Sequence, residues 1–427
     1  MKNKLWLCIL TKSGLITSIS IFVLIFNCYS LRQESYGQGT WTQKMDFGGA
    51  ARAYATGFSV GTKGYICCGD DGGIFPAGVQ NDLWEWDQAT NTWTQKAPFT
   101  GTARRKAFGF SIGTKGYVGC GQDAAGYTKD FYEYNPSSNT WTKKSDFGGT
   151  ARYGAVGFSI GTKGYAGTGY EATGPRDDFW EYNPSTNGWV QKAILAGGIA
   201  TAARLHAFGI GSATKGYIGG GDNGSTAKLD FWEYDPGADS WIKKANFNVA
   251  DRTEAVAFFI GTKGYAGTGI VASTYYQDLR AYDPSNNTWT AQASLPAPAV
   301  KRKSAVGFSI GTKGYIGTGI DNAFTSLNDF WEFNPGVGGV NEYENLVEVC
   351  IFPNPFSENA MLSVQSSTLQ VSGCELKIYD VFGQEVRNLK LETKKLKLER
   401  GNFSSGIYFY SLQSKNKILA TGKIIIE

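Results

Sequence analysis

The side chains of this chain that could do chemistry recur at two positions of an internal repeat. One position carries Asp70, Gln122, Tyr170, Asp222, Ile270 and Ile320, and the other carries Tyr54, Lys106, Gly154, His206, Glu254 and Ser304. If the copies converge, they surround a ligand with carboxylates, an amide, cations and aromatic rings, which suits a polar molecule such as a sugar. The candidate ligand-binding residues are therefore Asp70, Gln122, Tyr170, Asp222, Tyr54, Lys106, His206 and Glu254.

Familiar catalytic motifs are missing from the sequence. His206 is the only histidine, and no HExxH, HxH or CxxC pattern occurs, so we expect neither a metal site nor a cofactor. There is also no GxSxG motif of the kind that presents a nucleophilic serine. We assign no catalytic residue, and for His206 a hydrogen-bonded loop residue is favoured over a catalytic base.

The elements that must position these residues follow from the repeat itself. A TKGY block recurs at intervals of 48–52 residues, with tyrosines at Tyr65, Tyr117, Tyr165, Tyr217, Tyr265 and Tyr315. Within one copy, such as residues 104–144, four short runs rich in Phe, Tyr, Val, Ile, Thr and Trp are separated by turn residues. This pattern predicts four strands. The third is expected to stop at an Asn-Pro or Asp-Pro pair, at Asn135, Asn183, Asp235, Asp283 and Asn334.

Four-stranded sheets that repeat in this way bury both faces when they are arranged radially. We therefore expect an all-β fold, a six-bladed β-propeller over residues 38–339, with fourth-strand tryptophans packing blade on blade at Trp41, Trp93, Trp141, Trp189, Trp241 and Trp289. The last copy has its third strand at 330–335 but no Trp strand after it. A spare Trp strand, residues 40–44, precedes the first copy, so we expect it to complete the sixth blade.

The repeat resembles the kelch repeat. The resemblance lies in the Arg before the first strand, the Gly pair that ends the second, the third strand ending in Asp-Pro or Asn-Pro, and the Asn-x-Trp fourth strand. The kelch Gly-Gly appears as Gly-x-Gly at 167–169, 267–269 and 317–319, and only 219–221 keeps a true Gly-Gly doublet. The resemblance implies the propeller fold but not one function. Kelch-type copper radical oxidases need two His ligands and are excluded, whereas a kelch sialic-acid mutarotase is a known type.

The two faces of such a propeller differ in sequence. The loops between strands 1 and 2 and between strands 3 and 4 lie on one face and are nearly uniform, whereas the loops between strands 2 and 3 all differ. Individual side chains make specific binding, so we take the second face, here called the variable face, as the candidate site. The repeated arginines are expected to be scaffold rather than an anion site: Arg52, Arg104, Arg152, Arg204, Arg252 and Arg302.

Both ends of the chain lie outside the propeller. Residues 1–37 combine early lysines with an apolar stretch at 15–26, typical of a signal peptide and short leader, with an uncleaved anchor as the alternative. Residues 340–427 predict a small β-sandwich. They resemble the C-terminal sorting domain of type IX secretion cargo, at Pro353, Asn354, Pro355, Tyr379, Asp380, Gly383, Gly406, Tyr408, Gly422 and Lys423. This implies the type IX machinery as partner and a secreted or cell-surface location.

Charge and cysteine content add few constraints. The net charge of +4 gives no basic surface, so we expect no nucleic-acid partner, and no stable membrane span after signal removal. Cys68 and Cys120 occupy the same repeat position and are expected to be small apolar fillers, which leaves Cys67 unpaired. Pairing of Cys350 with Cys374 is left open. We therefore expect a non-enzymatic protein that binds a glycan or protein ligand, with a mutarotase-like sugar enzyme or a structural surface protein as alternatives.

Overall fold

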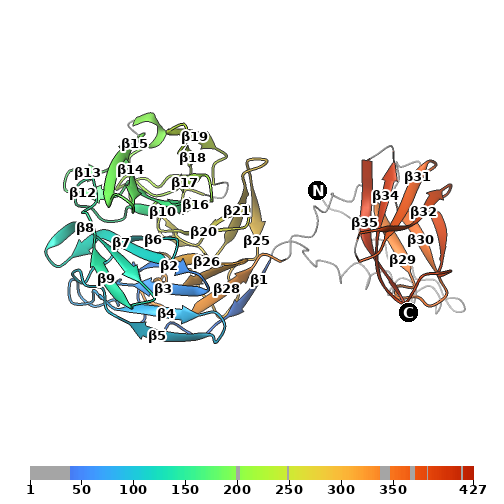
Figure 1. Cartoon of the computed structure of the whole chain (residues 1–427), viewed down its shortest axis with the longest axis horizontal. Helices are drawn as coiled ribbons and strands as arrows, with labels where there is room; N and C mark the ends of the chain where they lie inside the picture. The colour runs from blue at the N-terminus through green and yellow to red at the C-terminus, as the bar shows by residue number, and fades with distance from the viewer. Residues whose placement is uncertain are drawn as a thin grey trace, which may run out of the picture. The chain divides into compact units, whose positions relative to one another are not determined.

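The computed structural model describes residues 39–198, 202–247, 250–336, 347–365, 371–381, 383–414 and 417–427. The predicted signal segment and the predicted boundary at residue 339 fall outside these ranges. The chain divides into two compact units after Gly336 (Figure 1). Among the described residues, no helix has the length and apolar character that crossing a membrane requires.

The described part of the first unit is an all-β propeller with six four-stranded sheets, which we call blades 1 to 6. Blade 1 consists of β2 (Thr56–Val60), β3 (Lys63–Cys67), β4 (Leu83–Asp87) and β5 (Thr92–Lys96). Blade 2 consists of β6 (Phe108–Ile112), β7 (Lys115–Asp123), β8 (Gly126–Asn135) and β9 (Thr140–Lys143). Blade 3 consists of β10 (Val156–Ile160), β11 (Lys163–Gly167), β14 (Phe179–Asn183) and β15 (Gly188–Lys192). Blade 4 consists of β16 (Phe208–Gly211), β17 (Gly216–Gly219), β18 (Phe231–Asp235) and β19 (Ser240–Lys244). Blade 5 consists of β20 (Val256–Ile260), β21 (Lys263–Gly267), β24 (Leu279–Asp283) and β25 (Thr288–Gln292). Blade 6 consists of β26 (Val306–Ile310), β27 (Lys313–Gly317), β28 (Phe330–Asn334) and β1 (Thr40–Gln43).

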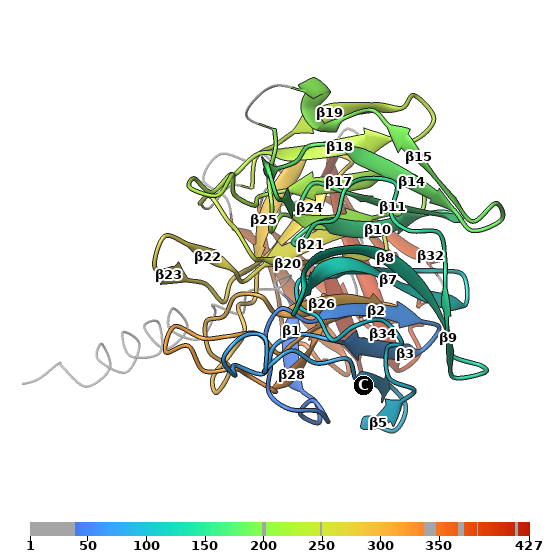
Figure 2. The ribbon, with the colours of Figure 1, turned by 90° about the vertical axis from the view of Figure 1, so that its left-hand side faces the viewer.

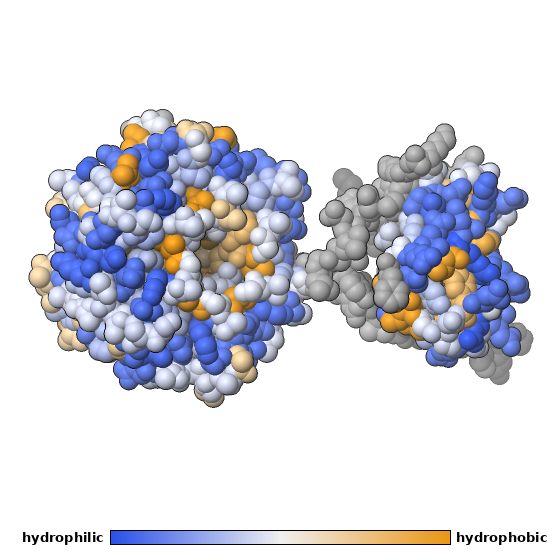
Figure 3. All heavy atoms as spheres, viewed as in Figure 1, coloured by the Kyte–Doolittle hydropathy of each residue, from blue (hydrophilic) through white to orange (hydrophobic). Residues whose placement is uncertain are grey.

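The first strands of the blades form a closed cycle at the axis. β2 contacts β6, β6 contacts β10, and the series continues through β16, β20 and β26 back to β2. In the view of Figure 3, the propeller shows a hollow with largely hydrophobic walls, close to where β20 and β26 lie in Figure 1. The third strands end at the residues predicted from the Asn-Pro and Asp-Pro pairs, such as Asn135 and Asp235.

Aromatic side chains hold neighbouring blades together. Phe131 of blade 2 packs edge-on against Tyr182 and Trp189 of blade 3, with ring centroids 4.8 and 5.1 Å apart. The same contact recurs where Phe330 of blade 6 meets Trp86 and Trp93 of blade 1. Each ring also adds the apolar burial that drives packing.

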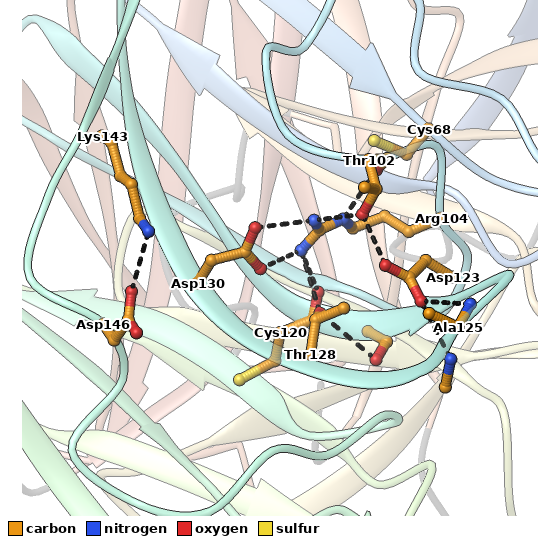
Figure 4. Close-up of polar contacts among 12 residues, drawn as sticks. Cys68, Thr102, Arg104, Cys120, Asp123, Ala125, Thr128, Asp130, Lys143 and Asp146 are labelled. Carbon is orange, nitrogen blue, oxygen red and sulfur yellow. Dashed lines mark hydrogen bonds and ion pairs between the residues drawn. The ribbon is translucent and has the colours of Figure 1, made fainter.

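The repeated arginines are buried scaffold residues, as expected. All six side chains are at most 1% exposed, and each pairs with an Asp that directly precedes the third strand or, for Asp130, lies within it. Arg104 also donates to the carbonyl of Cys120 and to the hydroxyls of Thr102 and Thr128 (Figure 4). A buried charge needs such complete pairing, so removing one partner is strongly destabilising.

The N-terminal strand closes the ring, which confirms the closure prediction. β1 pairs with β28 in register Thr40 to Asn334 through Gln43 to Trp331. The indole of Trp41 donates to the carbonyl of Ala293 at 2.7 Å. Each of the other fourth-strand tryptophans likewise donates to a backbone carbonyl in the segment that connects the preceding blade to its own.

The second unit is the predicted sandwich. One sheet has the order β29 (Glu348–Phe352), β30 (Asn359–Gln365) and β33 (Lys395–Glu399). The other has the order β32 (Glu385–Leu391), β31 (Cys374–Tyr379), β34 (Gly406–Ser414) and β35 (Lys417–Ile426). Leu362 of the first sheet and Leu376 and Leu412 of the second belong to one buried hydrophobic cluster.

Candidate functional site

A closed circuit of backbone hydrogen bonds fixes the residues that lie two positions after each repeated arginine. Each N–H donates at 2.9–3.0 Å to the carbonyl of its counterpart in the preceding blade, and the N–H of Tyr54 closes the circuit on Ser304. All six residues have φ between 53° and 63°, a left-handed conformation that costs a non-glycine residue on the order of 1 kcal/mol. The same conformation in every blade aligns these side chains around the axis: Tyr54, Lys106, Gly154, His206, Glu254 and Ser304.

The second predicted set lies directly beside the first. The residue before each member of the circuit forms an antiparallel bridge with the residue after Gly-x-Gly, or after Cys-Cys-Gly in blade 1. The pairs are Ala53–Asp70, Arg105–Gln122, Tyr153–Tyr170, Leu205–Asp222, Thr253–Ile270 and Lys303–Ile320. The structure therefore brings both sets together around the axis of the variable face. We call the two sets, with the residues that precede the circuit, the axial rim.

The aromatic rings of the rim cluster around Tyr153 of blade 3. The ring of Tyr153 lies 5.5 Å from Tyr170, 5.0 Å from Tyr127 and 5.8 Å from the imidazole of His206. These rings are only partly buried, so the cluster that they form offers faces on which a flat apolar surface can stack.

A cluster of charged side chains in blades 4 to 6 centres on Glu254 of blade 5. The carboxylate of Glu254 lies 3.2 Å from Lys303 Nζ and 3.7 Å from His206 Nδ1, and it accepts a hydrogen bond from Ser304. Asp222 lies 3.4 Å from the same imidazole nitrogen. Burial raises the pKa of Glu254, but electrostatic interactions with His206, Lys303 and Lys106 outweigh it and hold the pKa below its usual value. Glu254 is therefore ionised at neutral pH.

Lys106 of blade 2 lies between two tyrosines of the rim, and its contacts are rings. Its Nζ is 4.7 Å from the centroid of Tyr54 and 4.9 Å from that of Tyr153. Burial, with smaller contributions from Arg105 and Lys303, lowers the pKa of Lys106 to about 8, although Glu254 acts in the opposite direction. The ammonium is thus held in a poorly solvated place without a close carboxylate among the described residues, which makes it a natural partner for an anionic group.

The remaining predicted residues have more local roles. Asp70 is buried, pairs with Arg105 at 2.7 Å and accepts the N–H of Gly72. Gln122 accepts from the same guanidinium at 3.2 Å. Gly154 leaves room for the imidazole of His206, because a Cβ there would lie 2.8 Å from its Cδ2. The imidazole Nε2 is buried and has no hydrogen-bond partner among the described residues.

The loops of the variable face surround the rim and differ in structure as well as in sequence. Blade 2 extends β7 and β8 into a long hairpin, whereas blades 3 and 5 carry short ones, β12 (Tyr170–Glu171) with β13 (Gly174–Pro175) and β22 (Ile270–Val271) with β23 (Thr274–Tyr275). Figure 2 shows β22 and β23 at one side of the propeller and β9 at the opposite side. A groove of about 510 Å³ separates the loops of blades 1 and 2, lined by Pro76, Ala77, Val79, Thr102, Ala103, Asp123, Ala124 and Ala125.

Sequence reasoning missed the residues that support the rim. Arg105, Tyr153 and Lys303 occupy the position directly after the repeated arginine, and the same repeat comparison could have found them. Tyr127 comes from the β7–β8 hairpin, whose length only the structure gives. Nowhere in the described ranges do three or more His, Cys, Asp or Glu side chains gather closely enough to hold a metal ion.

The predicted sorting residues support the sandwich. The amide of Asn354 donates to the carbonyl of Lys423 and accepts the N–H of Ile425, which ties the segment after β29 to β35. The backbone of Asp380 closes a turn with Gly383, whose φ is 83°. Gly406 begins β34, the hydroxyl of Tyr408 donates to Ser404, and a Cβ at Gly422 would lie 2.6 Å from Tyr410. Pro353 and Pro355 flank Asn354, and Tyr379 ends β31.

Comparisons with known proteins agree with both halves of the chain. Residues 54–249 match the KLHDC2/KLHL20/DRC7 Kelch-repeats domain, and residues 350–427 match the secretion system C-terminal sorting domain. A solved structure titled "Structure of YjhT" is similar with a TM-score of 0.55 at 17% identity, covering 75% of this chain and 99% of that chain. No curated protein matches by sequence. The chain is therefore an exported kelch-repeat protein, a β-propeller followed by a type IX secretion C-terminal sorting domain.

Proposed function

We propose that the exported propeller is a non-enzymatic binding protein that recognises a glycan through the axial rim. The observation that supports this most is the presence, in one rim, of an aromatic cluster around Tyr153 and Tyr170 and of a charged cluster around Glu254 and Asp222. A sugar has a flat C–H face and an edge of hydroxyls, so it can stack on the aromatic cluster while it hydrogen-bonds to the charged one. A protein ligand recognised through the variable loops is the alternative occupant.

The ammonium of Lys106 suggests which glycans bind most tightly. It has ring contacts but no close carboxylate among the described residues, so a carboxylate on the sugar would supply the missing charge partner. Acidic sugars are therefore expected to bind better than neutral sugars of the same shape.

A glycan-array screen of the full chain tests the proposal, followed by affinity measurements on each glycan that binds. Glu254→Gln and Tyr170→Ala should each weaken binding by roughly tenfold or more, because each removes a charged hydrogen bond or a stacking face. Lys163→Ala, in the uniform turn of blade 3 on the opposite face, is the matched control and should bind as wild type. Binding that survives both rim changes would place the ligand elsewhere.

A sugar-active enzyme is the second candidate, and Lys106 is the observation that favours it. General acid–base groups work best with a pKa near the working pH, which fits Lys106 at about 8 better than the ionised Glu254. The rate at which the anomers of each bound glycan exchange, measured by NMR, separates the two functions. A binder shows no acceleration, whereas an enzyme shows turnover that Lys106→Met abolishes. A structural surface protein shows neither binding nor turnover.

A further inference from the structure

Two adjacent cysteines in blade 1 lie in direct contact. Cys67 ends β3, Cys68 follows it, and their Sγ atoms are 3.2 Å apart. This is shorter than the roughly 3.5–4.0 Å at which even carbon atoms pack. Both side chains are at most 1% exposed. Both thiols are free in the structure, as expected for Cys67, but the neighbour in the chain is close enough to react with it.

The other blades show that Cys67 is an unusual residue at its position. The corresponding residue is glycine in all five other copies, at Gly119, Gly167, Gly219, Gly267 and Gly317. A Cβ at any of these glycines would lie within 2.1–2.7 Å of a neighbouring atom. Blade 1 therefore accepts a side chain where every other blade avoids one, and that side chain is a thiol beside a second thiol.

We propose that Cys67 and Cys68 form a vicinal disulfide in the exported protein. Export through a type IX sorting domain takes the chain out of the reducing cytosol, where disulfides rarely persist. The adjacent Cα atoms, about 3.8 Å apart, are closer than the roughly 4.4–6.8 Å of ordinary disulfides. The bond is therefore strained and would be easy to reduce if it were exposed, but burial protects it.

The chemistry is thiol–disulfide exchange with a protein or small-molecule disulfide. One cysteine thiolate attacks the carrier disulfide, and the second cysteine then displaces the carrier from the mixed disulfide. The two cysteines lose two electrons and two protons, and the carrier leaves as two thiols. Burial raises the pKa of the Cys67 thiol well above its usual value, so exchange must occur before blade 1 packs against blade 2.

The disulfide would stiffen the turn that leads into the axial rim. The carbonyl of Cys68 accepts from Arg52 at 2.9 Å, and its N–H donates to Asp82 at 3.1 Å. Asp70, which holds Arg105, follows two residues later. A ring closed across 67–68 therefore fixes the backbone immediately before a rim residue, whatever ligand the rim binds.

Peptide mapping of the exported full chain tests this. The protein is denatured without reductant, treated with iodoacetamide and digested with trypsin; the fragment 64–96 then contains Cys67 and Cys68 as its only cysteines. We expect an unalkylated fragment about 2 Da lighter than the dithiol, which takes up two alkyl groups only after reduction. Two alkyl groups before reduction, or a cross-link to another fragment, would overturn the proposal.

Cys67→Gly is the matched variant, since it restores the residue that the other blades use. With its partner gone, Cys68 should be alkylated without reduction in every molecule, and the mass difference between reduced and unreduced fragment should disappear. Because alkylation is done on denatured protein, the result does not depend on how well the variant folds. A Cys68 that stays protected in this variant would show a different partner and refute the vicinal bond.

Discussion

Replacing Lys106 by Met should stabilise the propeller at neutral pH, although it removes a central rim residue. The lowering of the pKa from 10.5 to about 8 means that the buried ammonium is about 3 kcal/mol less stable than it would be in water. The two cation–π contacts with Tyr54 and Tyr153 offset about 0.5–1 kcal/mol each. Since Met fills nearly the same space without charge, we expect a net gain of about 1–2 kcal/mol at pH 7.

The gain should depend on pH with a definite sign. Below about pH 8, Lys106 is charged in both folded and unfolded chains, so the destabilisation is fully present. Between about pH 8 and 10.5 the folded chain loses this proton first, and the stability of the wild type rises toward that of Lys106→Met. The difference between the two proteins should therefore shrink over this range.

Denaturant unfolding followed by tryptophan fluorescence measures this in the full chain, because eleven of the twelve tryptophans lie between Trp41 and Trp331 and residues 337–427 contain none. The signal therefore reports mainly the propeller. Lys303→Met is the matched control. Burial lowers the pKa of Lys303, but Glu254 and neighbouring groups raise it by a larger amount, so that the pKa lies above its usual value. This cation therefore stabilises the fold, and its loss should destabilise the propeller from pH 7 to 10. A Lys106→Met protein that is less stable than wild type at pH 7, or whose gain is the same at pH 10, would refute the reasoning.

Three further predictions concern the scaffold. Deleting residues 40–44 removes Trp41 and exposes the edge of β28, so the propeller should lose about 3 kcal/mol or more in the same unfolding assay, and an unchanged curve would contradict closure by β1. Blade 5 has Ala281 and Gln292 where the other blades pair Glu with Lys. Ala281→Glu combined with Gln292→Lys should give Tyr265 a carboxylate partner and raise the free energy of unfolding by about 1 kcal/mol. A lower free energy of unfolding would show that the site cannot hold the pair. Asn354→Ala removes the acceptor of the Ile425 amide, whose hydrogen exchange should accelerate while propeller amides stay unchanged.

The sequence predicted the frame of this protein well because the repeat states each rule six times. Proline fixes where the third strands end, as at Asn183, and the missing Trp strand after residue 335 pointed to closure by β1. The repeat alignment also placed the circuit residues in one ring, since equivalent positions in a propeller lie at equivalent distances from its axis.

The contacts within the rim could not be predicted in the same way. Glu254 interacts with His206 and Ser304, which lie about 50 residues away on the two neighbouring blades, and which of these pairs form depends on side-chain rotamers rather than on spacing. The contact between Cys67 and Cys68 was missed because adjacent side chains in a strand point to opposite faces, whereas Cys68 has left the strand with φ of 65°.

The backbone circuit at the axis has a consequence for protein engineering. Main-chain groups alone make it, so its hydrogen bonds remain when the side chains change. The backbone demands only that a new residue tolerate the left-handed conformation, which Gly, Asn and Asp do most easily, although a side chain at Gly154 also needs a smaller residue at His206. Six positions that converge on one mouth can thus be varied in a combinatorial library without redesigning a single sheet. An exported kelch propeller of this kind is a ready framework for selecting new ligand specificities at a cell surface.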